Sequence, residues 1–307
     1  MKKSCINLLL PICLMFFVSC GSGNKVADDR DTPEKGTIRI SVDETFKPVI
    51  EEELRVHRSQ FPEANIIASY KSEAECFRDL QKDSTRMIIV ARGLTEKEME
   101  FYKSTLSYKP QYAELAYDAV AVIVNKEAKD SIFSFSDIRD ILSGKKPVTA
   151  IMDGKSATST VRYLKDSVLK NQEFGKNVVA AENSQEVIDI VAKRTDVIGF
   201  VGLSWIGDSY DPRQVAYLSK IRLSRVECTA CLEPDIYAKP SQATITRGEY
   251  PLARPLYYIL KENAAGLGTG FMNFMSLERG QLIFRRSFLA PAKMAFHKRV
   301  GSIKEGE

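Results

Sequence analysis

Residues 112–125, YAELAYDAVAVIVN, are the most informative segment for the fold of this chain. It is apolar along most of its length and is too long for one ordinary strand of about five or six residues. We interpret it as a strand that leaves one lobe of the protein and enters a second lobe near Tyr117 and Asp118. A chain that crosses between two lobes in this way creates a cleft, which hinge motion can open and close.

Strands and helices alternate before this crossing. Three short segments are expected strands: residues 37–42, 65–70 and 87–90. Helices are expected near Thr45 and near Cys76, and a capping box opens a third at Thr95. This alternation predicts βαβ units, and therefore a mainly parallel sheet with helices on both faces.

The same alternation follows the crossing. The expected strands are residues 148–152, 178–181 and 197–201, with helices between them. An earlier helix is capped by the pair Ser136-Asp137 and ends at Gly144. The chain is expected to return to the first lobe near residues 215–218. Residues 256–260 and a long helix over about 269–286 then complete that lobe.

The first twenty residues predict the compartment. Lysines 2 and 3 precede an apolar run, residues 6–18, that has the length of a signal-peptide core and is too short for a membrane span. The end of the run, Phe17-Val18-Ser19-Cys20, resembles a bacterial lipobox, in which the cysteine is lipidated and becomes the first residue of the mature chain. An ordinary signal peptide cleaved nearby is the alternative. We expect a protein of the bacterial cell envelope, anchored through a lipid on Cys20 and facing the periplasm or the cell exterior.

These observations predict six segments. With 307 residues, of which 44% are hydrophobic, the chain is long enough for two lobes that each bury a core. Small and charged residues after Cys20 indicate a flexible spacer. The expected boundaries are a signal peptide at 1–19, a lipidated linker at 20–36, the first lobe at 37–117 and 217–295, the second lobe at 118–216, and a tail at 296–307.

Composition argues against several functions. Lysine and arginine outnumber aspartate and glutamate by only 44 to 40, and no basic stripe with interleaved aromatic residues suggests a nucleic-acid partner. The two histidines, His57 and His297, offer little material for a metal site or a catalytic triad. We expect no enzyme activity, no metal and no cofactor. Cys228 and Cys231 have CxxC spacing, which we interpret as a structural disulfide or two inert thiols, with a redox enzyme as the alternative.

Four strand-to-helix turns carry polar residues suited to a ligand site, because ligands bind at the carboxyl ends of strands in such sheets. They are residues 43–45, 72–73, 91–93 and 153–160. The last turn contains four hydroxyl residues where a helix cap needs only one, so it predicts an oxyanion site at a helix start. The predicted ligand-binding residues are Thr45, Ser72, Arg92, Asp153, Ser156, Thr158, Ser159, Thr160 and Arg162.

Five segments resemble the phosphate-binding substrate-binding proteins of ABC importers. They are residues 115–125, 135–144, 198–202, 250–258, and the pair Gly280-Gln281 followed by 289–291. The resemblance implies an α/β fold of the type II periplasmic-binding-protein class, in which each lobe is a mainly parallel sheet with flanking helices and the ligand cleft lies between the lobes. It also implies a protein that captures phosphate or a related oxyanion and delivers it to an ABC transporter permease, which together with the lipobox predicts a solute-binding lipoprotein.

The ligand motif departs from the family pattern. Ile151 stands where the family has an arginine, Lys155 looks inserted, and Ala157 replaces a glycine. A carboxylate that accepts the proton of phosphate would reject sulfate, and Asp153 is the first candidate, with Asp43 or Glu44 second. The departures leave an alternative open: a lipoprotein of the same fold with a sensing or scaffold role that has lost phosphate binding.

Overall fold

The computed structural model describes residues 31–154 and 158–294. The predicted lipidation site Cys20 and the predicted ligand residue Ser156 lie outside these ranges. Within them, no helix has the length and apolar character needed to cross a bilayer.

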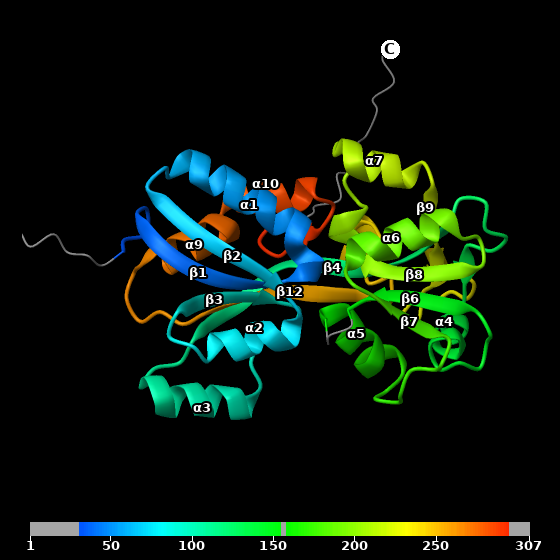
Figure 1. Ribbon diagram of the computed structural model, residues 1–307, viewed down its shortest axis with the longest axis horizontal. Coiled ribbons are helices and arrows are strands. Elements are labelled where there is room, and N and C mark those ends of the chain that lie inside the picture. The colour runs from blue at the N-terminus through cyan, green and yellow to red at the C-terminus, as the bar shows by residue number, and fades with distance from the viewer. Residues whose placement is uncertain (1–30, 155–157, 295–307) are drawn as a thin grey trace, which may run out of the picture. The chain divides into compact units, whose positions relative to one another are not determined.

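One run of hydrogen-bonded strands passes through both lobes, in the order β2-β1-β3-β12-β4-β8-β6-β7 (Figure 1). Its centre is β4 (Gln111–Asn125), the 15-residue strand that the sequence predicted to cross between the lobes. The first half of β4 pairs with β12 (Ala253–Leu260), and the second half pairs with β8 (Val197–Gly202). Both neighbours are antiparallel to β4. Because β12 lies in lobe 1 and β8 lies in lobe 2, the two lobes share β4 as one continuous strand.

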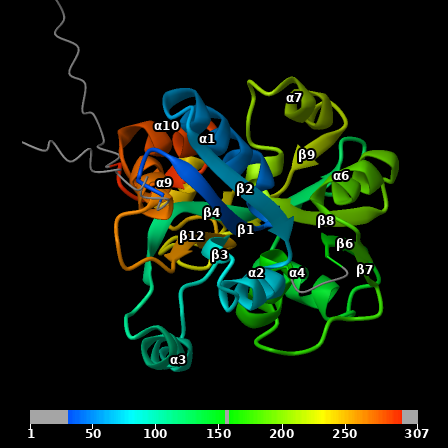
Figure 2. The ribbon, with the colours of Figure 1, turned by 60° about the vertical axis from the view of Figure 1, so that its left-hand side comes forward.

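In lobe 1, the parallel strands β1 (Gly36–Asp43), β2 (Ala64–Lys71) and β3 (Thr85–Val90) carry helices on both faces (Figures 1 and 2). Alternate residues of β3 show why: Met87 and Ile89 pack in one apolar cluster, and Ile88 and Val90 pack in another. The first cluster lies under α1 (Lys47–Gln60), α9 (Leu267–Ser276) and α10 (Glu278–Arg286). The second lies under α2 (Glu73–Leu80) and α3 (Glu96–Leu106).

Lobe 2 repeats this design around β8. Strands β6 (Thr149–Asp153) and β7 (Val178–Ala181) extend the sheet in parallel. Its helices are α4 (Phe135–Leu142), α5 (Ser159–Tyr163) with a π-helical continuation (Leu164–Val168), α6 (Ser184–Lys193), α7 (Pro212–Leu218) and α8 (Gln242–Thr246). The short strands are β5 (Ile132–Phe133), β9 (Ile221–Leu223), β10 (Arg225–Glu227) and β11 (Tyr237–Ala238). Two 3-10 turns, η1 (Glu44–Phe46) and η3 (Leu203–Trp205), and the final strand β13 (Ala290–Pro291) complete the elements.

The return to lobe 1 differs from the expectation. Residues 212–218 form helix α7, because Asp211 caps the segment and Pro212 occupies its first turn. The apolar residues Val226, Tyr250 and Leu252 still belong to the core of lobe 2. We therefore place the return at the start of β12, about 35 residues later than the sequence suggested.

Two helix boundaries also differ. The cap of α4 is Ser134, which forms a capping box with Asp137, so the helix begins one residue before the predicted Ser136. The expected long C-terminal helix is two helices, because Leu277 has an extended backbone with φ −97° and ψ 179°. Gly280 fits directly against this break, where an added Cβ would lie 2.4 Å from the Cα of Met275.

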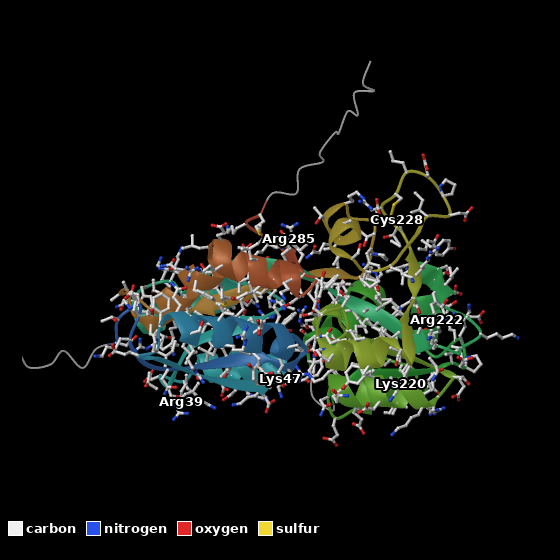
Figure 3. All side chains as sticks on the ribbon, turned by 90° about the horizontal axis from the view of Figure 1, so that it is seen from above. Arg39, Lys47, Lys220, Arg222, Cys228 and Arg285 are labelled. Carbon is white, nitrogen blue, oxygen red and sulfur yellow. A yellow bond between two sulfur atoms is a disulfide. The ribbon has the colours of Figure 1, made fainter. Side chains whose placement is uncertain are left out.

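Cys228 and Cys231 form a disulfide in the loop that follows β10. Figure 3 shows Cys228 at the periphery of lobe 2, whereas Lys47 lies where the two lobes meet. Of the alternatives that the CxxC spacing left open, the structure shows the disulfide.

Candidate ligand site between the lobes

The lobe 1 side of the site is the turn after β1. The carboxylate of Asp43 accepts a hydrogen bond from the Thr45 amide at 2.9 Å, which fixes the turn into η1. Thr45 is buried against lobe 2, since Ser204 Oγ donates to its carbonyl oxygen at 3.0 Å. At Gly202 an added Cβ would lie 2.5 Å from the Thr45 methyl group. The two lobes are therefore in close contact at this turn.

The lobe 2 side is the turn between β6 and α5. Thr158 caps α5 by accepting from the Val161 amide, and its hydroxyl donates to Asp153 Oδ1 at 3.0 Å. Asp153 Oδ2 accepts from Ser184 Oγ at 2.8 Å and from Thr45 Oγ1 at 3.4 Å. The buried carboxylate of Asp153 thus joins α5, α6 and the turn from lobe 1.

A buried ion pair lies beside these turns. Arg254 of β12 and Asp118 of β4 are partners across antiparallel strands, and both side chains are fully buried. The Nε and Nη2 atoms of Arg254 donate to Asp118 Oδ2 at 3.2 and 3.0 Å. Its Nη1 atom instead faces α5, where it donates to Ser159 Oγ at 3.1 Å and to Thr160 Oγ1 at 3.4 Å. The guanidinium therefore reaches the helix start that the sequence singled out.

Carboxylates from lobe 1 accept several hydrogen bonds from groups of lobe 2. Asp43 Oδ2 accepts from the Ser159 amide at 2.9 Å, and Glu44 Oε2 accepts from Ser184 Oγ at 3.0 Å. Arg162 of α5 forms an ion pair with Glu73 at the start of α2. The lobes are thus held together by bonds between the chain's own groups.

The site is rich in negative charge. Two guanidiniums, of Arg254 and Arg162, face five carboxyl groups, those of Asp43, Glu44, Glu73, Asp118 and Asp153. Burial, and next the charge of Glu73, raises the pKa of Asp43 to about 6. Burial, and next the charge of Asp153, raises the pKa of Glu44 to about 7. Burial also raises the pKa values of Asp118 and Asp153. Near neutral pH, part of this charge is therefore cancelled by bound protons.

The structure brings together most of the residues predicted from the helix start at 153–160. Thr45, Asp153, Thr158, Ser159 and Thr160 lie in the buried cluster. Two further predicted residues, Ser72 and Arg92, do not lie in this cluster. The Ser72 hydroxyl is used in the capping box of α2 with Glu75.

Arg92 is likewise directed elsewhere, because its guanidinium binds Glu98 and lies 3.6 Å from the centre of the Phe77 ring. Arg162 lies at the edge of the cluster, paired with Glu73. Among the described charged side chains of the predicted turns, Glu73 and Asp153 take part in the interlobe contact, together with Asp43 and Glu44, which the sequence ranked second as acceptors.

Three residues of the site, Arg254, Asp118 and Ser184, are not predicted from the sequence. A signal was present for the first two: each is a charged residue within a mostly apolar strand. A charge in such a strand requires a partner, and the antiparallel register of β4 and β12 places the two residues opposite each other.

Comparison with known proteins identifies the family. Residues 27–278 match the model of the PBP superfamily domain. The chain is 21% identical over 305 residues to the phosphate-binding protein PstS of Staphylococcus epidermidis, covering 94% of this chain and 88% of that protein. It is 23% identical over 224 residues to the PstS of Pseudomonas aeruginosa, covering 66% of this chain and 65% of that protein.

A solved structure shares the fold. It is that of a phosphate ABC transporter substrate-binding protein with bound phosphate from Clostridium perfringens, which superimposes with a TM-score of 0.67 at 19% identity and covers 84% of this chain and 100% of that one. The two-lobed α/β architecture predicted from the sequence is therefore confirmed, and the chain belongs to the PBP superfamily.

Proposed function

We propose that this chain is an extracytoplasmic solute-binding lipoprotein that captures phosphate, or a related oxyanion, between its lobes for an ABC importer. The observation that carries the proposal is the buried guanidinium of Arg254, whose Nη1 atom faces the hydroxyls of Ser159 and Thr160. In the closed arrangement the guanidinium donates to these two hydroxyls. Groups this close together can all donate to one oxyanion that takes the place of the bonds between them, and hydrogen bonds to charged oxygens are the stronger kind. The relatives named as phosphate-binding proteins support this assignment.

Binding requires the lobes to separate first. In the closed arrangement the Ser159 amide is taken by Asp43, which belongs to the other lobe. We infer that a phosphate oxygen replaces this carboxylate, and that the lobes then close on the ligand. A ligand stabilises the closed form only through contacts that the open form lacks, so donors from both lobes are needed.

We expect the triple variant Thr158→Ala, Ser159→Ala, Thr160→Ala to bind phosphate at least tenfold more weakly than the wild type. In the proposed complex the hydroxyls of Ser159 and Thr160 donate to charged phosphate oxygens, and each such bond contributes about 1.5–3 kcal/mol. Thr158 positions this helix start by capping α5 and donating to Asp153. Isothermal titration calorimetry measures the change, and circular dichroism checks the fold. The matched control is Ser134→Ala with Ser136→Ala, which removes hydroxyls from the start of α4 instead. Equal phosphate affinity in the triple variant and the wild type would exclude this site.

A second candidate function rests on the charge of the site. Five carboxyl groups face two guanidiniums, and Asp43 already holds the Ser159 amide. This surplus opposes an anionic ligand and favours a lipoprotein of the same fold with a sensing or scaffold role. The two functions separate in the same calorimetry, since a folded wild type without measurable phosphate binding supports the second.

Membrane attachment through Cys20 completes the proposal. The lipobox-like sequence that ends at Cys20 supports it, although it lies outside the described residues. We expect Cys20→Ser to accumulate as an unprocessed precursor, because the modified cysteine is where the signal peptide is cleaved. Mass spectrometry of the membrane fraction should find an acylated N-terminus at Cys20 in the wild type. An unmodified mature N-terminus at another residue would exclude the lipid anchor.

A further inference from the structure

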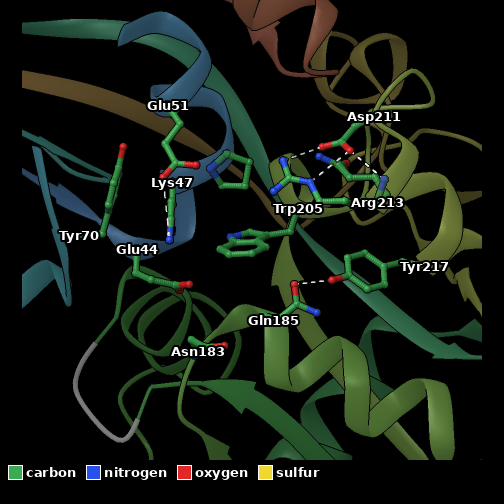
Figure 4. A pocket seen from close by; sticks show the side chains of 12 residues that line it. Glu44, Lys47, Glu51, Tyr70, Asn183, Gln185, Trp205, Asp211, Arg213 and Tyr217 are labelled. Atoms are coloured by element: carbon green, nitrogen blue, oxygen red, sulfur yellow. Dashed lines mark hydrogen bonds and ion pairs between the residues drawn. The ribbon is translucent and has the colours of Figure 1, made fainter. Parts of the chain in front are cut away.

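A cleft of about 400 Å³ opens between the lobes beside the buried cluster (Figure 4). Three aromatic side chains line it: Tyr70 of β2, Trp205 of η3 and Tyr217 of α7. They come from both lobes, and Figure 4 shows Trp205 between Tyr70 on one side and Tyr217 on the other. Its size and its mixture of rings and polar groups are typical of a site for a small organic molecule.

The cations of this cleft are already paired. Lys47 Nζ lies 3.9 Å from Glu51 Oε1, and Arg213 donates to the carboxylate of Asp211. Lys47 Nζ also lies 5.5 Å from the centre of the Tyr70 ring, so an ammonium group already approaches this ring. Among the described residues that line the cleft, each cation therefore has a carboxylate partner.

One carboxyl group at the floor of the cleft, that of Glu44, has no cationic partner in the described part of the chain. The Glu44 side chain accepts a hydrogen bond from the Ser184 hydroxyl. Ser184 connects it to Asp153, so further negative charge lies behind the floor. Aromatic rings together with a surplus of carboxylates attract a positive ligand and repel an anion.

Two polar atoms of the wall also lack partners. Tyr70 Oη and Trp205 Nε1 are buried without a hydrogen-bond partner among residues 31–154 and 158–294. An unpartnered buried polar group costs free energy, so a ligand oxygen that reaches either atom after a small side-chain rotation would contribute to binding.

We propose that this cleft is a second ligand site, which binds a small organic ammonium compound that also carries an oxygen. The rings of Trp205 and Tyr217 contact the alkyl ammonium group, and Glu44 supplies the opposite charge. The cleft adjoins the Arg254 cluster through Glu44, whose partner Ser184 also donates to Asp153, but its lining does not include Arg254, Ser159 or Thr160.

Tryptophan fluorescence of the full chain tests this proposal, because Trp205 is the only tryptophan in the sequence. The probe is choline, and its neutral isostere 3,3-dimethyl-1-butanol is compared at the same ionic strength. Both are titrated near pH 8, where Glu44, with a pKa raised to about 7, is mostly ionised. We expect a saturable change of Trp205 emission with choline, and about tenfold or more weaker binding of the neutral alcohol. Glu44→Gln and Tyr217→Leu should each weaken choline binding by about threefold or more.

Matched controls are Glu63→Gln and Tyr237→Leu, which change the same residue types away from the cleft and should leave choline binding unchanged. Equal binding of choline and the neutral alcohol would overturn the proposal, because the cleft would then be merely apolar. So would the absence of a saturable response, or equal choline affinity in the cleft variants and the wild type. Phosphate is titrated separately, so its binding or failure to bind is recorded independently of the choline result.

Discussion

Replacing Arg254 with methionine is expected to lower the free energy of unfolding by about 3–5 kcal/mol. The guanidinium donates twice to Asp118, and neither side chain is exposed to solvent. Removing it leaves a buried carboxylate without a counter-charge in the centre of the shared sheet. Chemical denaturation at neutral pH, followed by circular dichroism, measures the loss.

The double variant Arg254→Met, Asp118→Leu separates the charge from the packing. Replacing a whole buried ion pair by apolar side chains of similar volume often costs little, so most of the lost stability should return. Arg194→Met is the matched control, because Arg194 pairs with Asp196 on the surface and its removal should leave unfolding nearly unchanged. A single Arg254→Met variant as stable as the wild type would show that Asp118 does not depend on this partner.

Replacing Asp43 with asparagine is expected to strengthen phosphate binding about tenfold or more near pH 8 and to have little effect near pH 5. The pKa of Asp43 is raised to about 6, so its carboxyl group is ionised at the higher pH and mostly protonated at the lower one. When ionised, it competes with phosphate for the Ser159 amide and repels the anion. The substitution removes that charge, so its effect should fade as the pH drops through about 6.

Calorimetry of both proteins over this pH range gives the ratio of their affinities. The ionisation of phosphate itself affects both proteins alike and cancels in the ratio. Asp130→Asn, on an exposed loop of lobe 2, is the control for a general loss of negative charge. An affinity ratio that stays constant between pH 5 and pH 8 would contradict the proposed competition.

The raised pKa of Asp43 also has a consequence for folding. A carboxyl group that binds its proton more tightly in the folded state contributes stability below its unfolded pKa, near 3.9. This contribution is lost as the pH rises through about 6, the pKa in the folded protein. The Asp43 carboxylate that competes with phosphate therefore also lowers the stability of the folded protein above about pH 6.

Local patterns in the sequence were sufficient to predict the architecture. The apolar stretch 112–125 predicted the strand shared by the lobes, and the structure has β4 at 111–125. The capping box at Thr95 predicted the start of α3. Both features depend only on residues that are close together in the chain, so a single sequence is enough to predict them.

The features that the sequence did not reveal depend on distant residues. The pairing of Arg254 with Asp118 depends on the register between strands that are separated by more than 100 residues. Residues 215–218 predict a return to lobe 1, but they lie in helix α7, because the apolar residues of a short segment do not distinguish a strand from a helix. Arg92 could be placed at a predicted turn, but its partner Glu98 could be identified only once α3 was positioned.

We expect an oxyanion to bind where Arg254, Ser159 and Thr160 meet. Equilibrium dialysis of the wild type against labelled phosphate near pH 6 tests it most directly, with arsenate and sulfate as competitors. We expect one saturable phosphate site per chain, displaced by arsenate and not by sulfate, because a carboxyl acceptor in the site requires a protonated ligand. Absence of phosphate binding in both the folded wild type and the folded Asp43→Asn variant would contradict this expectation.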